Sequence, residues 1–255
     1  MYAEKNTTNV NNNHETISKM KELRLLGMAH AFQTTLETGM SEKYTIDELL
    51  THLIDSEWDD RNNRRRERLR KAAGFRYQAS FSELDFSINR NLDKNQMLRF
   101  SDCNWINEHK DIIITGPTGC GKSFIGSALG YQACDHGYKT TYYLTSRLFG
   151  TLKEAKADGS YLKILAKIYK SDLLILEDFG LSPFDNESRL ALLDILEDRH
   201  GRKSTIFLSQ LPVSSWHELI GDSTIADAIM DRIVYGSHRI ELQGESIRKK
   251  MYKKS

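Results

Sequence analysis

The residues best suited to chemistry form one short stretch, GPTGCGKS, which matches the pattern G-x-x-x-x-G-K-[ST]. Its glycines allow backbone N–H groups to curl around phosphate oxygens. Lys122 can reach the β- and γ-phosphates of a nucleotide, and the hydroxyl of Ser123 can bind Mg²⁺. The sequence therefore predicts a phosphate-binding loop, formed by Gly116, Pro117, Thr118, Gly119, Cys120, Gly121, Lys122 and Ser123.

Two carboxylates follow an apolar run in LLILED, residues 173–178. Glu177 is the candidate Mg²⁺ ligand, directly or through water, and Asp178 is the candidate group that polarises the attacking water. A second apolar run, STIFLSQ, ends in Gln210, which can sense the γ-phosphate or orient that water. A plain buried strand with solvated acids at its tip is the competing interpretation of Glu177 and Asp178.

Two arginines near the C-terminus are further candidates. Arg232, in STIADAIMDRIVYG, can stabilise transition-state charge, often at the site of a neighbouring subunit. Arg248, in GESIRKK, can contact the nucleotide. A surface salt bridge for Arg232 and a solvated basic tail for Arg248 are equally compatible with the sequence.

Alternating strands and helices must position these residues. Short apolar runs predict strands at 111–116, 139–145, 172–178, 204–210 and 238–243. Amphipathic stretches between them predict helices at 121–135, 146–157, 160–170, 186–200, 214–219 and 223–233. This alternation is typical of an α/β fold, with a parallel sheet flanked by helices on both faces. The glycine-rich loop then lies between the first strand and the first helix.

The first hundred residues have a different, helical pattern. Thr45 and Glu48 form a capping-box pattern at a helix start. An apolar face follows, and Gly74 ends the helix; the face consists of Ile46, Leu49, Leu50, Leu53 and Ile54. We expect a polar, mobile tail over residues 1–15 and a helical domain over 16–80. Residues 81–110 read as an irregular connecting stretch that comprises a linker and the start of the α/β domain, which continues over residues 111–255.

Composition limits the possible settings. The chain has 255 residues, a net charge of +1 and three widely spaced cysteines without a CxxC pair, which favours a reducing cytoplasm and excludes a disulfide framework. No apolar run is long enough to cross a membrane. Basic residues gather between Trp58 and Arg76, which predicts contact with a polyanion such as DNA. They are Arg61, Arg64, Arg65, Arg66, Arg68, Arg70, Lys71 and Arg76.

Together these motifs, in this order and spacing, closely resemble the IstB family of insertion-sequence ATP-binding proteins, relatives of the helicase loader DnaC. The resemblance rests on GPTGCGKS, LLILEDFG, SQLPVSSWHELIGDSTIADAIMDRIV and HRIELQGESIRKK. It extends upstream through KMKELRLLGMAHAFQ and DSEWDDRNNRRRERLRKAAGFRY, so it covers nearly the whole chain after the polar tail.

The resemblance implies an AAA+ ATPase that uses ATP and Mg²⁺, preceded by a small helical domain for DNA binding and oligomerisation. Lys122 and Ser123 would be the Walker A residues, and Glu177 and Asp178 the Walker B pair. Gln210 would be the first sensor, Arg232 the arginine finger and Arg248 the second sensor. A helix facing DNA in the helicase-loader branch has a possible counterpart here, carrying Lys153, Lys156, Lys163 and Lys167.

The resemblance also implies a partner and a mode of action. Such proteins assemble as homo-oligomers on duplex DNA with ATP and assist the transposase IstA, and we expect little sequence preference. The Walker B end departs from the usual Asp-Asp, because Glu177 is one methylene longer. Since magnesium demands tight geometry, we expect slow hydrolysis and a switch-like use of ATP.

Three other functions stay open. A helicase loader acting on single-stranded DNA would use stacked aromatic side chains, for which Trp58, Phe75 and Tyr77 are candidates. A small-molecule kinase would use the loop without a basic N-terminal region. The complete set of motifs argues against a plain DNA-binding module with a vestigial nucleotide site, but Glu177 keeps this alternative open.

Overall fold

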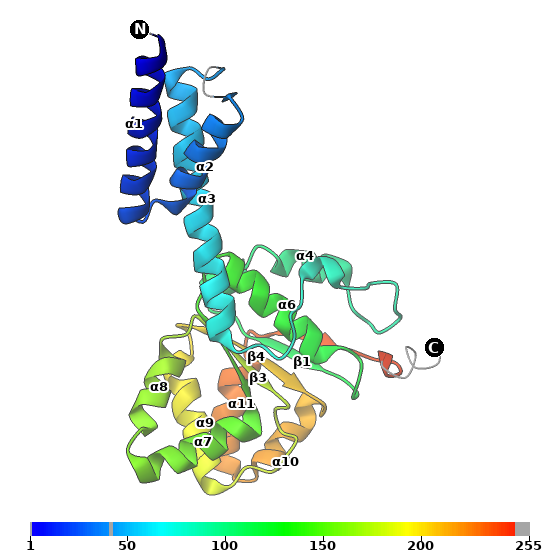
Figure 1. Ribbon diagram of the computed structural model, residues 1–255. Helices are drawn as coiled ribbons and strands as arrows, with labels where there is room; N and C mark the ends of the chain where they lie inside the picture. Colours follow the sequence, from blue (N-terminus) through cyan, green and yellow to red (C-terminus); the bar gives the residue numbers. More distant parts are fainter. Residues whose placement is uncertain (1, 41–42, 248–255) are drawn as a thin grey trace. The chain divides into compact units, whose positions relative to one another are not determined.

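The computed structural model of the chain describes residues 2–40 and 43–247 (Figure 1). It divides into two compact units, Met1–Glu67 and Arg68–Ser255. The first unit contains helices α1 (Tyr2–Glu22) and α2 (Leu26–Glu37) and most of α3 (Ile46–Ala73). The boundary between the units therefore falls inside a helix, upstream of the boundary at residue 80 expected from the sequence.

Helix α1 occupies the region where the sequence predicts a mobile polar tail. It begins at Tyr2 and continues to Glu22, beyond the end of the predicted tail at residue 15. The stretch contains no glycine or proline, the two residues that interrupt helices most strongly. Polar composition alone therefore gave the wrong local structure for this part of the chain.

Helix α3 begins and ends where the sequence predicts. The backbone N–H of Thr45 donates to Glu48 Oε2 at 2.8 Å, and the N–H of Glu48 donates to Thr45 Oγ1 at 3.3 Å, which completes the capping box. The predicted apolar face is wrong in part. Leu53 is buried, but Ile46 is 87% exposed, and Leu50 and Ile54 are also exposed.

The second unit is built on a parallel five-stranded sheet in the order β2-β3-β4-β1-β5. The strands are β1 (Ile112–Thr115), β2 (Thr140–Leu144), β3 (Leu173–Glu177), β4 (Ser204–Ser209) and β5 (His238–Glu241). Each lies within its predicted range, so the predicted α/β class and parallel sheet are confirmed. Because β4 separates β1 from β3, the carboxyl end of β4 lies between the ends of the other two.

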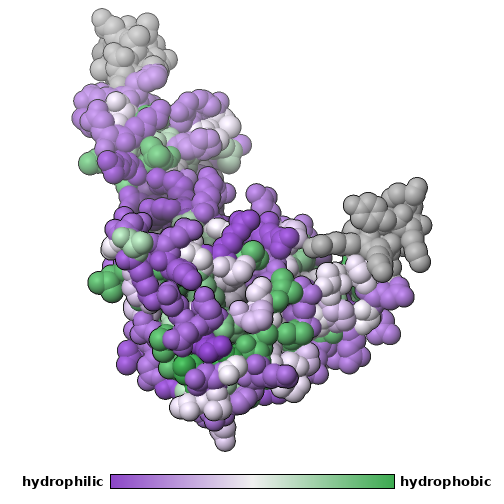
Figure 2. Space-filling view, turned by 90° about the horizontal axis from the view of Figure 1, so that it is seen from below, coloured by the Kyte–Doolittle hydropathy of each residue, from purple (hydrophilic) through white to green (hydrophobic). Residues whose placement is uncertain are grey.

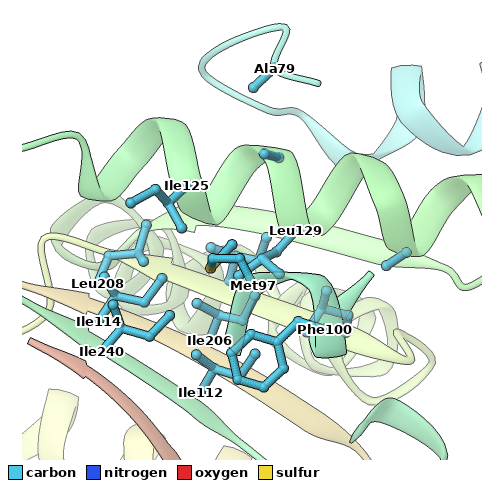
Figure 3. Close-up of a cluster of buried hydrophobic side chains, with 14 of the residues drawn as sticks. Ala79, Met97, Phe100, Ile112, Ile114, Ile125, Leu129, Ile206, Leu208 and Ile240 are labelled. Atoms are coloured by element: carbon cyan, nitrogen blue, oxygen red, sulfur yellow. The ribbon is translucent and has the colours of Figure 1, made fainter. Parts of the chain in front are cut away.

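Alternate residues of the strands enter two separate cores. Ile112 and Ile114 of β1 pack beneath α6 (Lys122–Asp135) together with Met97 and Phe100 (Figure 3). Ile113, between them, points to the opposite face. That face is covered by α7 (Thr145–Asp158), α8 (Tyr161–Tyr169), α9 (Asn186–Arg199), α10 (Trp216–Ile220) and α11 (Ser223–Val234). The sheet is thus covered on both faces, as continuous apolar strands require.

The stretch before β1 is more ordered than the sequence predicts. Helix α4 (Lys94–Phe100) begins at Asp93, whose side chain accepts the N–H of Asn95 at 2.8 Å. Two shorter elements, η2 (Phe81–Glu83) and α5 (Asn104–Asn107), flank it. Met97 and Phe100 of α4 are fully buried in the core under α6. The segment therefore packs as part of the α/β unit, which fits its predicted role as the start of that unit better than its predicted role as a linker.

The surface mixes polar and apolar side chains. Figure 2 shows hydrophilic residues over most of the visible face, interspersed with apolar patches on the second unit. Within residues 2–40 and 43–247, no helix is long and apolar enough to cross a membrane.

Candidate nucleotide-binding site

The glycine-rich loop joins β1 to α6, so a buried strand enters it and a helix N-terminus leaves it. Gly121 precedes α6 with a φ of 97°, a left-handed conformation that suits glycine. Lys122 is buried, and its ammonium donates to the carbonyl oxygens of Gly116 at 2.7 Å and Pro117 at 2.9 Å. Burial lowers the pKa of Lys122. The lysine therefore lies curled inside the loop, beside the helix end that favours anions.

The strand ends bring three predicted residues to this loop. The side-chain oxygen of Gln210, after β4, accepts the hydroxyl of Thr118 at 2.5 Å. Its amide nitrogen donates to Asp178 Oδ1, after β3, at 3.4 Å. Gln210 thus connects the phosphate loop to the carboxylate expected to polarise water.

Asp178 has an unusual backbone. Its φ is 53°, in the left-handed region that aspartate tolerates better than most residues. The preceding strand end is fixed, because the hydroxyl of Thr145 donates to the carbonyl of Glu177 at 2.7 Å. The N–H of Phe179 donates to the carbonyl of Leu208 on β4 at 2.9 Å. These bonds turn the chain sharply after β3 and aim the two carboxylates differently.

Glu177 carries a partner that the sequence does not predict. Its Oε1 accepts Arg76 Nη1 at 3.1 Å, and the charge of Glu177 raises the pKa of Arg76. Glu177 itself is 1% exposed. Its other oxygen, Oε2, is buried and forms no hydrogen bond of normal geometry among the described residues, but the Tyr142 hydroxyl lies close to this carboxylate, and burial and the charge of Glu177 raise the pKa of that tyrosine. One lone carboxylate oxygen is thus available to a cation or a water molecule.

These oxygens suit magnesium. The candidate donors are Glu177 and the Ser123 hydroxyl, both hard oxygen ligands, and both line the same cavity. Within the described part of the chain there is no cluster of three or more His, Cys, Asp or Glu side chains that could hold a metal alone. A cation here would therefore need oxygen ligands from a bound phosphate or from water, as magnesium sites at phosphates usually have.

All these groups line one cavity of about 440 Å³. One wall holds the loop and the strand ends. The other wall comes from the stretch before α4 and from Ile247. The predicted residues at the cavity are Thr118, Gly119, Gly121, Lys122, Ser123, Glu177, Asp178 and Gln210, and the residues not predicted for it include Arg76, Tyr77, Glu83, Asp85, Ile88 and Arg90.

Arg232 lies elsewhere. Its guanidinium donates to the carbonyl of Ala228 at 2.7 Å and forms an ion pair with Glu197. It lines a second cavity with Asp111 and Thr205, at the amino ends of β1 and β4. The phosphate loop is at the carboxyl ends, so Arg232 is on the opposite edge of the sheet from its own nucleotide cavity. Arg248 lies outside the described residues.

The predicted DNA-binding residues of α3 are in several settings. Arg61 donates to Glu57 at 2.6 Å, and Arg64 pairs with Asp60 at 2.6 Å, both within the helix. In the second unit, Arg70 makes two bonds to Asp135, at 2.5 and 2.6 Å. Arg65, Arg66, Arg68 and Lys71 are exposed.

The lysines of α7 and α8 face acidic neighbours in part. Lys153 pairs with Asp185 at 3.8 Å, and Lys156 pairs with Glu187 at 3.5 Å, both near the start of α9. Lys163 and Lys167 on α8 are exposed. Contact of any of these residues with DNA stays a prediction.

The parallel sheet, with β4 between β1 and β3 and the phosphate loop after β1, defines an AAA+ P-loop ATPase fold. The chain belongs to the IstB-like ATP-binding protein family, whose model matches residues 18–255. This confirms the family resemblance seen in the sequence.

Relatives and solved structures agree with this assignment. The chain is 42% identical over 242 residues to a protein of Sinorhizobium fredii described as an insertion sequence ATP-binding protein, covering 95% of this chain and 99% of the relative. It is 40% identical over 201 residues to the ATP-binding protein of insertion sequence IS1162 from Pseudomonas fluorescens, covering 78% of this chain and 87% of the relative. The crystal structure of DnaI shares the fold, with a TM-score of 0.55 and 22% identity over 65% of this chain and 91% of DnaI.

Sequence reasoning missed two arginines of the cavity. Arg76 was grouped with the basic run of α3, although Gly74 separates it from the helix. Arg90 was given no function, because LDFSINRNL has neither a motif nor a period. The signal in the sequence was weak in both cases: a glycine that breaks the basic run, and a lone arginine in a stretch of mixed polar and apolar residues.

Proposed function

We propose that this chain is an ATP-dependent AAA+ regulator that assembles on duplex target DNA and recruits or stimulates a partner transposase. The observation that carries the proposal is the cavity in which Lys122, Ser123, Glu177, Asp178 and Gln210 converge. The relatives described as insertion sequence ATP-binding proteins support the context of DNA transposition. The three cysteines are buried and free, which fits work in a reducing cytoplasm.

The five converging residues named above have distinct roles in the proposed ATP hydrolysis. Lys122 exchanges the carbonyls of Gly116 and Pro117 for the β- and γ-phosphates. Ser123 and Glu177 would hold magnesium, which would neutralise charge on the phosphates. Asp178 polarises the attacking water, and Gln210 positions it, because its amide already connects Asp178 to Thr118.

The pairing of Glu177 supports slow turnover. Arg76 occupies one oxygen of this carboxylate, so a cation at Glu177 has to compete with a guanidinium. ATP then acts mainly as an assembly signal, and hydrolysis resets the assembly at a modest rate.

DNA binding rests on the exposed basic residues of α3. Arg65, Arg66, Arg68 and Lys71 are exposed on this helix, and none belongs to a base-reading motif. We expect phosphate contacts, little sequence preference and affinity that falls steeply with salt.

Single-stranded DNA is the second candidate substrate, because the sequence also resembles the helicase loader DnaC. Stacking with bases needs accessible aromatic rings. Phe75 packs against Tyr131 with ring centroids 4.6 Å apart, and Tyr77 lines the nucleotide cavity. Only Trp58 of the three candidate rings is largely exposed, at 69%. The described aromatic residues therefore favour duplex DNA.

Assembly follows from the position of Arg232. A residue at the amino ends of the strands serves a nucleotide held by another copy of the chain more readily than its own. We therefore include a homo-oligomer with Arg232 acting in trans, where it stabilises charge on the transferring phosphate.

Sedimentation of the purified protein with duplex DNA tests the proposal. The runs use ATP with Mg²⁺, ADP with Mg²⁺, and single-stranded DNA of the same length. We expect a large complex only with ATP and duplex DNA. Lys122→Ala should abolish it, whereas Lys94→Ala, at an exposed lysine of α4, should leave it intact.

Two other results would separate the alternatives. A large complex on single strands in preference to duplex would support the helicase-loader function. A protein that stays small in every condition and ignores DNA would contradict the proposal and favour a small-molecule kinase.

A further inference from the structure

Arg90 is the most deeply buried charged residue among those that line the nucleotide cavity from the stretch before α4. It lies between η2 and α4, and it is 5% exposed. Its own carbonyl accepts the N–H of Gln243, which ties this stretch to the segment after β5 at 3.0 Å. Its backbone is therefore fixed on the second unit, and its side chain points toward the phosphate loop.

The guanidinium bonds only to neutral acceptors. Nη1 donates to the carbonyl of Cys120 at 3.1 Å, and Nη2 donates to the carbonyl of Asp85 at 3.1 Å. Nε is buried without a partner among the described residues. The nearby Asp85 carboxylate accepts instead from the N–H and hydroxyl of Ser87, at 2.8 and 2.6 Å.

Arg199 provides the comparison, since it is the other buried arginine of this unit and is 1% exposed. Its Nε and both terminal nitrogens are all bonded; the acceptors are Thr205 Oγ1 and the carbonyls of Ile168, Ser171 and Ser204. A buried cation without such compensation is costly. Burial lowers the pKa of Arg90, and the nearby Asp85 carboxylate acts in the opposite direction without forming an ion pair with it.

The cavity beside Arg90 can accommodate an anion. Arg90 lines the cavity together with Lys122 and Ser123, at the start of the 14-residue helix α6. A Cβ added to Gly121 would overlap Arg90 Nη1, so the guanidinium touches the loop backbone. Backbone N–H groups at such a helix start attract phosphate, and the arginine adds a full charge beside them.

The position along the nucleotide follows from the neighbours. Glu177, Asp178 and Gln210 mark the end where the γ-phosphate reacts. On the side of Arg90, the cavity is lined by Ile88 and Ile247, apolar side chains that suit a base and ribose. Arg90 Nη1 and Ile247 both lie close to Gly121, so the guanidinium is near the phosphate loop and near an apolar side chain suited to the base and ribose.

We propose that Arg90 binds the α-phosphate of the nucleotide, as a cation held ready in the wall of the cavity. This rests on the proposed function only in requiring that the chain bind ATP or ADP. Lys122 recognises the terminal phosphates, and Arg90 recognises the phosphate next to the ribose. ATP and ADP share the α-phosphate, so Arg90 contributes equally to both.

Calorimetric titration with ATP, ADP, AMP and adenosine tests the assignment. Arg90→Met keeps the length of the side chain and removes the charge. We expect it to weaken ATP and ADP by a similar factor, about 10- to 100-fold. It should also remove most of any preference for AMP over adenosine. Lys122→Met should instead weaken ATP more than AMP.

Thermal unfolding without nucleotide separates binding from a structural role. Since Arg90 lacks an anion in the described structure, Arg90→Met should unfold at the same temperature as wild type or higher. Arg90→Lys retains the charge and should recover part of the ADP affinity lost in Arg90→Met. A lower unfolding temperature with unchanged ADP affinity would overturn the proposal, as would equal ADP affinities of the Lys and Met variants.

Failure of the broader proposal looks different. If wild type binds neither ATP nor ADP, the nucleotide function itself fails. If wild type binds both nucleotides and Arg90→Met binds them equally well, only the role of Arg90 fails.

Discussion

Two arginines line the nucleotide cavity, and their surroundings differ. Arg76, on the side of the strand ends, has a side chain that is 48% exposed and forms an ion pair with the buried Glu177. Arg90, on the side of the preceding segment, is 5% exposed and bonds only to carbonyl groups. The same residue type thus occurs once with a carboxylate and once without.

This difference separates two ways of using a cation. An arginine paired with a carboxylate stabilises the site before magnesium arrives and then competes with it. An arginine without a carboxylate lowers stability on its own and gains when an anionic ligand binds. Residue type and sequence position do not distinguish these cases, whereas the partner atoms do.

Among these variants, we expect Gly121→Ala to have the largest effect, because it disturbs the contact between the phosphate loop and Arg90. A Cβ there would overlap Arg90 Nη1, and the φ of 97° strains any residue but glycine. We expect ATP affinity to fall by at least about 100-fold, measured with a fluorescent ATP analogue. Gly150→Ala in α7, where no atom lies within 4 Å of the added Cβ, is the matched control and should bind normally. Normal binding by Gly121→Ala would show that contact with Arg90 does not matter.

Glu177→Gln removes the carboxylate from the paired side. We expect ATP hydrolysis to fall by about 100-fold or more, because the metal loses a charged ligand. ATP binding in the presence of EDTA should persist, since Lys122 and Arg90 remain. Phosphate release at saturating ATP and analogue binding without metal measure the two effects. Hydrolysis at the wild-type rate would exclude Glu177 from the metal site.

Arg76→Gln should have a smaller effect of opposite sign. It removes the competitor for Glu177, so we expect the Mg²⁺ concentration for half-maximal ATP binding to fall by about three- to ten-fold, a modest change because Arg76 is half exposed. Arg76→Lys keeps the charge and serves as the control. An unchanged or raised Mg²⁺ requirement in Arg76→Gln would contradict competition between the two cations.

Arg70 and Arg68 extend the comparison to the predicted DNA surface, with the smallest effects. Arg70 is paired with Asp135 and lies over the Tyr131 ring at 5.3 Å, so Arg70→Ala should cost about 1 kcal/mol of unfolding free energy.

Arg68 is exposed, so Arg68→Ala should keep stability and lower the salt dependence of duplex binding by about one phosphate contact. Chemical denaturation measures the stability of Arg70→Ala, and salt titration of duplex binding measures the effect of Arg68→Ala. A loss of stability in Arg68→Ala and none in Arg70→Ala would contradict these predictions.

Local patterns made much of this site predictable. The glycine-rich loop lies between β1 and α6 because a short apolar run and an amphipathic helix flank it in sequence. Glu177, Asp178 and Gln210 meet there because the carboxyl ends of parallel strands share one edge of the sheet. These inferences needed only the parallel direction of the strands and the position of each polar residue after the end of its strand.

The remaining features depend on tertiary contacts. Arg76 was expected on a DNA surface because it follows a basic run, but Gly74 ends α3 with a φ of 76°, and Arg76 then reaches Glu177. No sequence motif identified Arg90, because its role is inferred from the fact that its guanidinium forms no ion pair in the described structure. Helix α4 was missed because it is only seven residues long, too short for its period to be read.

The placement of Arg232 at the far edge of the sheet has a consequence for how activity is counted. If this arginine completes the cavity of a neighbour, an isolated chain has no complete site: its own cavity lacks an arginine, and its Arg232 has no cavity to complete. In an open row of copies, one end always holds a cavity that no arginine completes. The rate per chain would then rise with the length of the row, and only a closed ring would put every bound ATP to use.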